Sequence, residues 1–223
     1  VGIQTFLMWD FNNEKYNTPY ELYAEKLNDN YPNITLTSLP IKMMKARYYI
    51  NNDSIAKAKS LLFSSIKANP YVKGPELLLA DIYFNEMKYD SSLHFAKDAF
   101  YNLPNVNAHR SIYFRALRHF KDSTELDKAF NLIKHYNNPT HWYDYFTSRY
   151  SIVGKDDKKL ISEIQNFKVK FPNENQAQIN EIETFVSIGS EQFSLSYLIA
   201  NEAEKEFINE NYLRSAELYE TSI

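Results

Sequence analysis

The stretches "ARYYINNDSIAKAKSLLFSSIKANP" (residues 46–70) and "ADIYFNEMKYDSSLHFAKDAFYNLP" (residues 80–104) carry alanine, tyrosine, asparagine and proline at matching places, 34 residues apart. Self-similarity at a fixed interval of this length is typical of chains built from repeated structural units. The two stretches are therefore predicted to form the same local structure.

Each stretch carries the signals of two helices. Over residues 75–87, the apolar positions include Leu78, Leu79 and Ile82, which form a stripe with the 3.6-residue period of a helix. A second amphipathic run follows the short polar segment "KYD" and ends at Pro104, because proline cannot continue a helix. We predict a helical hairpin that must stack on copies of itself to bury its apolar face.

Small side chains recur at equivalent places in the two hairpins. They let helices approach closely, while larger neighbours such as Tyr49, Leu62 and Tyr83 fill the adjoining space. The first helices carry Ala46 and Ala80, and the second helices carry Ala58, Ser65, Ser92 and Ala99.

A 34-residue period with this arrangement of small and large residues resembles the tetratricopeptide repeat family. The match is clear over 39–72 and 73–106, where only Ala96 departs from the expected pattern. The resemblance implies an all-α fold, a right-handed superhelical solenoid, and we expect one such domain over 1–223. Its further parts are degenerate repeats at 107–140 and 141–174, an extra helix at 175–189 and an incomplete terminal hairpin at 190–223.

The degenerate repeats place bulky residues where the family has small ones, as at Phe114 and Phe167. We interpret both as helical hairpins with altered packing. Upstream, "NTPYELYAEKLNDNYP" predicts another helix, because Thr18 and Glu21 form a capping box around Pro19. The segment 33–39 is expected to be a linker.

The composition excludes several classes of function. A net charge of −3 is unsuited to general nucleic-acid binding, and the absence of cysteine excludes thiolate chemistry. The chain has only four glycines, too few for glycine-rich phosphate-binding loops. The segment "GKDDKK" (154–159) is therefore expected to be a solvated turn. The five histidines have no zinc-site spacing. We predict no catalytic residue, no cofactor and no metal site.

Binding is the remaining kind of work. In the tetratricopeptide family, the first helices of successive hairpins line a concave groove. Carried over by register, its residues here are Arg47, Asn51, Asp81, Phe84, Asn85, Arg115, Arg118, Trp142, Tyr145 and Arg149, together with Met43, Ile50, Leu77, Ser111, His119 and Ile152.

One register supports a real surface. The ninth repeat position reads Arg47, Asp81, Arg115 and Arg149, so three of the six arginines share it. Guanidinium and amide groups among aromatics suit a protein or peptide partner that carries an acidic or carboxylate group. The alternative is that these arginines form intramolecular salt bridges and the aromatics pack in the core.

Residues 39–104 also resemble the repeat region that follows the membrane part of bacterial O-antigen ligase or polymerase-type proteins. That resemblance implies an extramembrane domain whose membrane region lies outside this chain. The lack of an initial methionine and an ending inside an apolar run fit a piece of a longer protein. The richness in lysine and asparagine is typical of bacterial proteins from AT-rich genomes.

A third possible function is that of a carbohydrate-binding solenoid of the cell envelope. It predicts that Trp142 and neighbouring tyrosines form an exposed platform.

Overall fold

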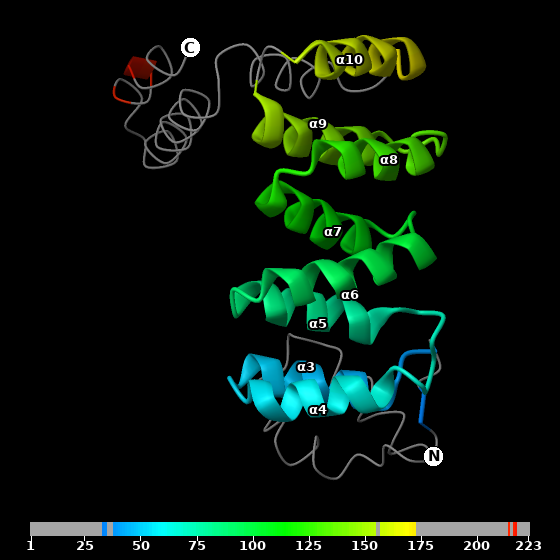
Figure 1. Ribbon diagram of the computed structural model, residues 1–223, viewed down its shortest axis with the longest axis vertical. Helices are drawn as coiled ribbons and strands as arrows, with labels where there is room; N and C mark the ends of the chain where they lie inside the picture. Colours follow the sequence, from blue (N-terminus) through cyan, green and yellow to red (C-terminus); the bar gives the residue numbers. More distant parts are fainter. Residues whose placement is uncertain (1–32, 35–37, 155–156, 173–213, 215, 218–223) are drawn as a thin grey trace. The chain divides into compact units, whose positions relative to one another are not determined.

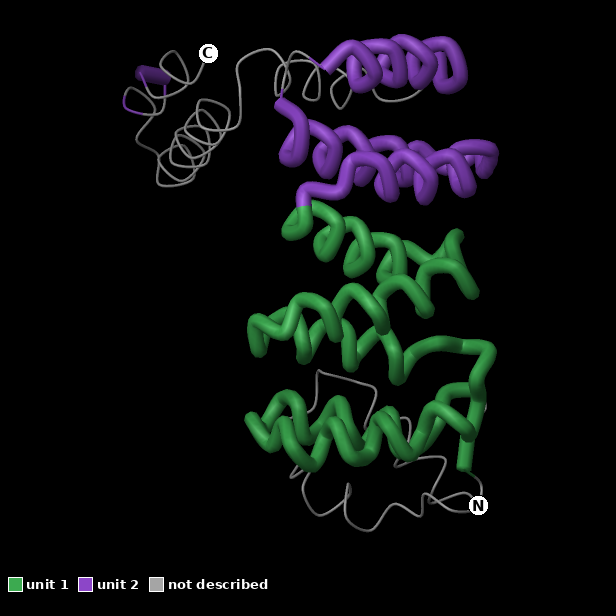
Figure 2. Tube along the Cα trace, in the orientation of Figure 1, with its two compact units in different colours: residues 1–120 green, residues 121–223 purple. Residues whose placement is uncertain are grey.

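A computed structural model of the chain describes residues 33–34, 38–154, 157–172, 214 and 216–217. Helices are the regular elements of this described part, as the sequence predicts, and the isolated bridge between Ile34 and Pro40 is its one β-type pairing. The chain divides into two compact units, residues 1–120 and 121–223 (Figure 2). The expected capping box at Thr18, the extra helix at 175–189 and most of the terminal hairpin lie outside the described residues.

Unit 1 contains five described helices, drawn in blue to green in Figure 1. The pairs α3 and α4, and α5 and α6, are antiparallel neighbours joined by short turns, and α7 packs on both α5 and α6. The bounds are α3 Ile41–Asn51, α4 Ile55–Ser65, α5 Gly74–Asn85, α6 Tyr89–Asn102 and α7 Asn107–Phe120. The two hairpins predicted from the sequence are therefore present as pairs of packed helices.

The 34-residue period is visible in the backbone of the turns. Asp53, Met87 and Lys121 follow the ends of α3, α5 and α7, and all three have positive φ, at 55°, 59° and 53°. In the first two turns, the next residue donates its N–H five residues back, from Ser54 to the carbonyl of Tyr49 and from Lys88 to that of Tyr83, each at 2.8 Å. This is the Schellman ending of a helix, repeated with the same geometry.

The small residues lie where the sequence places them. All six of the set Ala46, Ala58, Ser65, Ala80, Ser92 and Ala99 are fully buried. The Ser92 hydroxyl on α6 donates to the Ala80 carbonyl on α5 at 2.7 Å, a contact that needs two closely approaching helices. The predicted role of small side chains in hairpin packing is confirmed at these positions.

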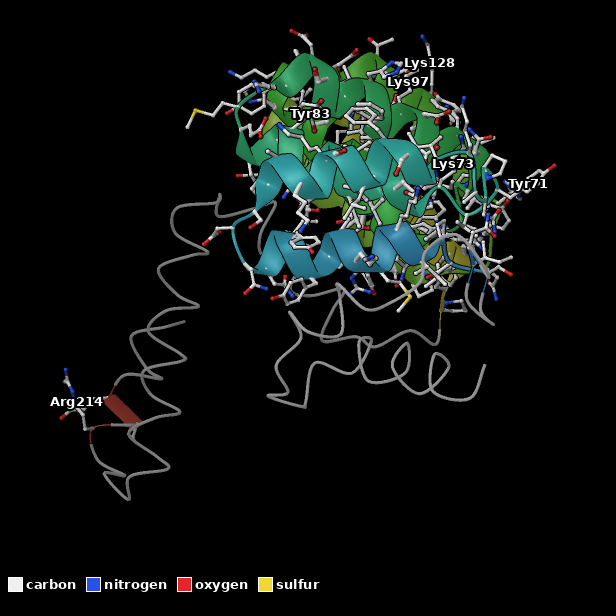
Figure 3. All side chains as sticks on the ribbon, turned by 90° about the horizontal axis from the view of Figure 1, so that it is seen from below. Tyr71, Lys73, Tyr83, Lys97, Lys128 and Arg214 are labelled. Atoms are coloured by element: carbon white, nitrogen blue, oxygen red, sulfur yellow. The ribbon has the colours of Figure 1, made fainter. Side chains whose placement is uncertain are left out.

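Helix α7 solves the same packing problem with large residues. Phe114, at the place of the expected alanine, is fully buried, and so is its neighbour Tyr113. Phe100 of α6 stacks on Tyr113 with ring centroids 5.0 Å apart and lies 6.0 Å from Phe114. In the connection between α4 and α5, Tyr71 is 82% exposed and projects outward (Figure 3).

Unit 2 contains three described helices, α8 Ser123–Ile133, α9 Pro139–Val153 and α10 Lys158–Lys170. Residues 214, 216 and 217 are also described, and they are helical. Helix α9 packs on both α8 and α10. The core of unit 2 is aromatic. Phe130 stacks on Tyr145 with ring centroids 3.8 Å apart, and Trp142 lies against Phe146 and Phe167. Across the described part of the chain, no helix is both long and apolar enough to cross a bilayer.

We expect Ala80→Leu to destabilise the protein by about 1 to 3 kcal/mol, because the added atoms must fit a fully buried site between α5 and α6. The measurement is the free energy of unfolding from urea denaturation. The control is Ala56→Leu on the exposed side of α4, which should change stability by less than about 0.5 kcal/mol. Equal effects of the two substitutions would contradict the close approach of the helices.

Candidate functional site

An open groove lies between α5 and α7 in unit 1. Its volume is about 320 Å³, and its walls come from the first half of α5 and from one face along most of α7. The lining residues are Leu77, Leu78, Asp81, Ala108, Ser111, Ile112, Arg115 and Arg118. Because α5 and α7 are the first helices of their predicted repeats, this is where the family register expects a groove.

The groove brings together five residues that the register predicts for it. Leu77 and Asp81 come from α5, and Ser111, Arg115 and Arg118 come from α7. The register missed Leu78, Ala108 and Ile112, which add apolar wall. Leu78 belongs to the apolar stripe of α5, so the sequence predicts that it packs against a neighbouring helix. The pattern does not show that Leu78 also borders the groove.

Asp81 and Arg115 form an ion pair inside the groove. The Arg115 Nη2 atom lies 2.5 Å from Asp81 Oδ1, and the two residues are one 34-residue repeat apart. Their side chains are 49% and 34% exposed, respectively. An ion pair this accessible stabilises the fold by roughly 0 to 1 kcal/mol. It therefore orients the guanidinium group but costs little free energy to break.

Aromatic rings hold the other side of Arg115. Its guanidinium carbon lies 4.2 Å from the centre of the Phe84 ring, a cation–π contact. Phe84 in turn packs edge-on against Tyr89, and Tyr89 stacks on His119 with ring centroids 3.5 Å apart. Arg115 is therefore oriented by a carboxylate and by an aromatic cluster drawn from α5, α6 and α7.

The chemistry available to the groove is recognition of a polar group beside an apolar one. Two arginines and one aspartate give its lining a net charge of one positive, and Leu77, Leu78 and Ile112 supply the apolar surface. No group of three histidine, aspartate or glutamate side chains suited to a metal occurs in the described residues.

Other residues of the expected surface are exposed but lie outside this groove. Arg47 and Asn51 are exposed on α3, and Asn85 is exposed at the end of α5. Met43, expected to face a partner, is instead 8% exposed and belongs to the core around α3 and α4.

Three expected surface residues of α9 are buried, which corrects the sequence-based assignment. Trp142 is 4% exposed, Tyr145 is fully buried and Arg149 is 6% exposed. The exposed Trp142 platform that a carbohydrate-binding solenoid would need is therefore absent. The reason is the drift of the fourth repeat: the aromatic run "HWYDYFTSRY" supplies the core of unit 2.

Arg149 is the centre of an ion-pair network within unit 2. It contacts Asp127 of α8 through Nη1, at 2.5 Å, and it binds both carboxylate oxygens of Asp157 through Nε and Nη2, at 2.6 and 3.0 Å. Asp127 also accepts from the Tyr145 hydroxyl at 2.8 Å and from Lys159 at 2.7 Å. This network ties α8, α9 and the beginning of α10 together.

The network shifts the pKa values of its members. The hydrogen bonds from Arg149 hold the pKa of Asp157 below its ordinary value. Burial, and then the hydrogen bond to the Asp127 carboxylate, raises the pKa of the Tyr145 hydroxyl. Asp157 has a second task, because it caps α10 by accepting from the backbone N–H of Leu160 at 2.7 Å.

The sequence carried one usable sign of this network. An aspartate directly before the apolar run "KKLISEI" is a typical N-cap, so Asp157 could have been assigned to a helix start instead of to a solvated turn. Nothing near Asp127 marks it as a partner of Arg149, because the two residues meet only through the packing of α8 on α9.

We expect Arg149→Met to lower the free energy of unfolding by about 2 to 4 kcal/mol, because it leaves two largely buried carboxylates without their main cation. Arg47→Met is the matched control, since Arg47 holds the same repeat position but is exposed, and its cost should be about 1 kcal/mol or less. Similar losses in the two variants would contradict a structural role for Arg149.

The low pKa of Asp157 gives a pH dependence. Its contribution to stability is complete above the ordinary aspartate value of 3.8 and is lost as the pH falls through the lower value of the folded state. We expect Asp157→Asn to be less stable than the wild type at pH 7, with the difference shrinking towards pH 3. Urea denaturation at both pH values measures it, and because asparagine still caps a helix, the difference reports on the pair with Arg149. A constant difference would contradict this assignment.

In comparisons with known proteins, the chain has no significant match to a protein-family model, a curated protein or a solved structure.

Proposed function

We propose that the protein is an interaction scaffold of the tetratricopeptide type, whose hairpins stack as a right-handed superhelix and whose α5–α7 groove binds an acidic segment of a partner protein. The observation that carries this proposal is the groove itself. Five of its eight lining residues are those that the repeat register assigns to the partner-binding side.

The size of the groove limits what it can hold. Its volume of about 320 Å³ is at the lower end of the range of roughly 300 to 1,000 Å³ for small-molecule sites. One or two side chains of a partner fill such a space. The groove is therefore suited to a short anchor of a peptide segment, and the rest of the segment would lie along the helices outside it.

The charge of the groove favours an acidic anchor. Arg115 is held in position by Phe84 and Asp81, and Arg118 lines the same wall one helical turn further on. A guanidinium group that is already oriented loses less conformational freedom when it binds a carboxylate. An aliphatic residue next to the acidic one would contact Leu77, Leu78 and Ile112.

The test is binding to an array of octapeptides that are acetylated and amidated at their ends. One half of the array carries a single aspartate or glutamate among random residues, and the other half carries asparagine or glutamine at that place. We expect the protein to bind members of the acidic half at least about tenfold more tightly, the effect of one charge-assisted hydrogen bond. The double substitution Arg115→Gln and Arg118→Gln should abolish this preference.

The matched control removes two positive charges elsewhere. Lys67 is exposed in the turn after α4, Lys97 is exposed on α6, and both lie outside the groove. The double substitution Lys67→Gln and Lys97→Gln should therefore leave the preference unchanged. Equal binding to both halves of the array, or equal losses in the two double variants, would overturn the proposal.

A further inference from the structure

We infer that the α5–α7 groove selects its partner segment by spacing, and that it binds an extended segment in which one residue separates an aliphatic anchor from the acidic anchor. The inference rests on the proposed function of the groove, and it makes Leu77 a specificity-determining residue. The two anchors are then neighbours in space without being neighbours in sequence.

The groove has an apolar end and a charged end. Leu77 and Leu78, in the first half of α5, form the apolar end. The guanidinium group of Arg115 defines the charged end, because it contacts Asp81 and lies over the ring of Phe84, both further along α5. A segment that fills both ends needs one aliphatic and one acidic side chain.

The geometry of α5 gives the distance between the two ends. Leu77 and Leu78 precede Asp81 and Phe84 by three to seven residues, with a mean of five. Because a helix rises about 1.5 Å per residue, the two ends of the groove lie roughly 7 Å apart. This distance is the length that a partner segment must match.

Helix α7 has the same interval and adds a polar group in its middle. Ala108 and Ile112 precede Arg115 by seven and three residues, and Ser111 lies about one turn before Arg115. Ser111 is exposed, so its hydroxyl can donate to a backbone carbonyl of the segment. An extended segment leaves its carbonyls available, whereas a helical segment bonds them internally. The middle of the groove therefore favours an extended segment.

An extended chain matches the distance at one spacing. It rises about 3.3 Å per residue, and adjacent side chains point to opposite faces. Two residues with one other between them therefore share a face and lie about 6.6 Å apart, close to the distance between the two ends. Residues four positions apart also share a face, but about 13 Å separates them, which is too far.

The experiment uses octapeptides of glycine and serine, blocked at both ends, that carry one aspartate and one leucine. The leucine stands one, two, three or four positions from the aspartate, in both orders. We expect a separation of two to give the tightest binding, by about fivefold or more, because it lets the leucine side chain lose water contact while the carboxylate reaches Arg115. The direction of the bound segment decides which of the two orders shows this advantage.

Leu77→Ala tests the apolar end of the groove. It should reduce the advantage of the two-position separation to about twofold or less, and it should leave the preference for aspartate over asparagine intact. Leu132→Ala is the matched control, because Leu132 is an exposed leucine of α8 outside the groove. It should leave the advantage unchanged, and circular-dichroism melting verifies that each variant is folded.

The outcomes separate the inference from the proposed function. Equal binding at all separations, or tightest binding at any separation other than two, overturns the inference. A separation of four as the tightest would indicate a helical segment. An advantage that survives Leu77→Ala unchanged also overturns the inference. In each of these cases the proposed function stands if acidic peptides still bind more tightly than their amide counterparts, and the loss of that preference overturns both.

Discussion

Two helices can lie close enough for a side-chain hydroxyl of one to reach a backbone carbonyl of the other only where both present small residues. In this protein, that contact joins Ser92 to Ala80, and the corresponding small residues of the first hairpin are also fully buried. The close approach sets the spacing of α5 and α6, which in turn places α7 against both. The groove between α5 and α7, and the register that brings Asp81 opposite Arg115, follow from this spacing.

The same repeat position has different roles along the chain, and packing explains the difference. In unit 1, the ninth-position side chains are partly or fully exposed, and Arg115 pairs with Asp81 where solvent can reach both. In unit 2, aromatic residues fill the core around α9, and Arg149 is drawn into a buried network with Asp127 and Asp157. The arginine is chemically the same, but Arg115 forms a partly exposed pair with one carboxylate, whereas Arg149 holds three helices together.

Local patterns could predict the helices and much of the groove, because the signals that determine them lie within one repeat. The apolar stripes, the closing prolines and the small residues each depend on neighbours at most a few turns away. The register selects Leu77, Asp81, Ser111, Arg115 and Arg118, and all five line the space between α5 and α7. The burial of Trp142, Tyr145 and Arg149 could not be predicted in this way. It depends on how α8 and α10 pack on α9. Because the bulky Phe167 occupies a position where the family has a small residue, the family pattern does not describe this packing.

The recurring turn after each first helix has a consequence for how the chain folds. Asp53 and Met87 take a left-handed conformation that glycine adopts more readily, so each of these two turns has a backbone cost that the packing of its two helices offsets. The turn and its two helices must therefore form together, as a local cooperative unit closed by a loop of a few residues. Short loops of this kind close quickly, and contacts that span one repeat or less give a low contact order. Folding can begin at either hairpin of unit 1 and spread to its neighbour, without waiting for distant parts of the sequence to meet.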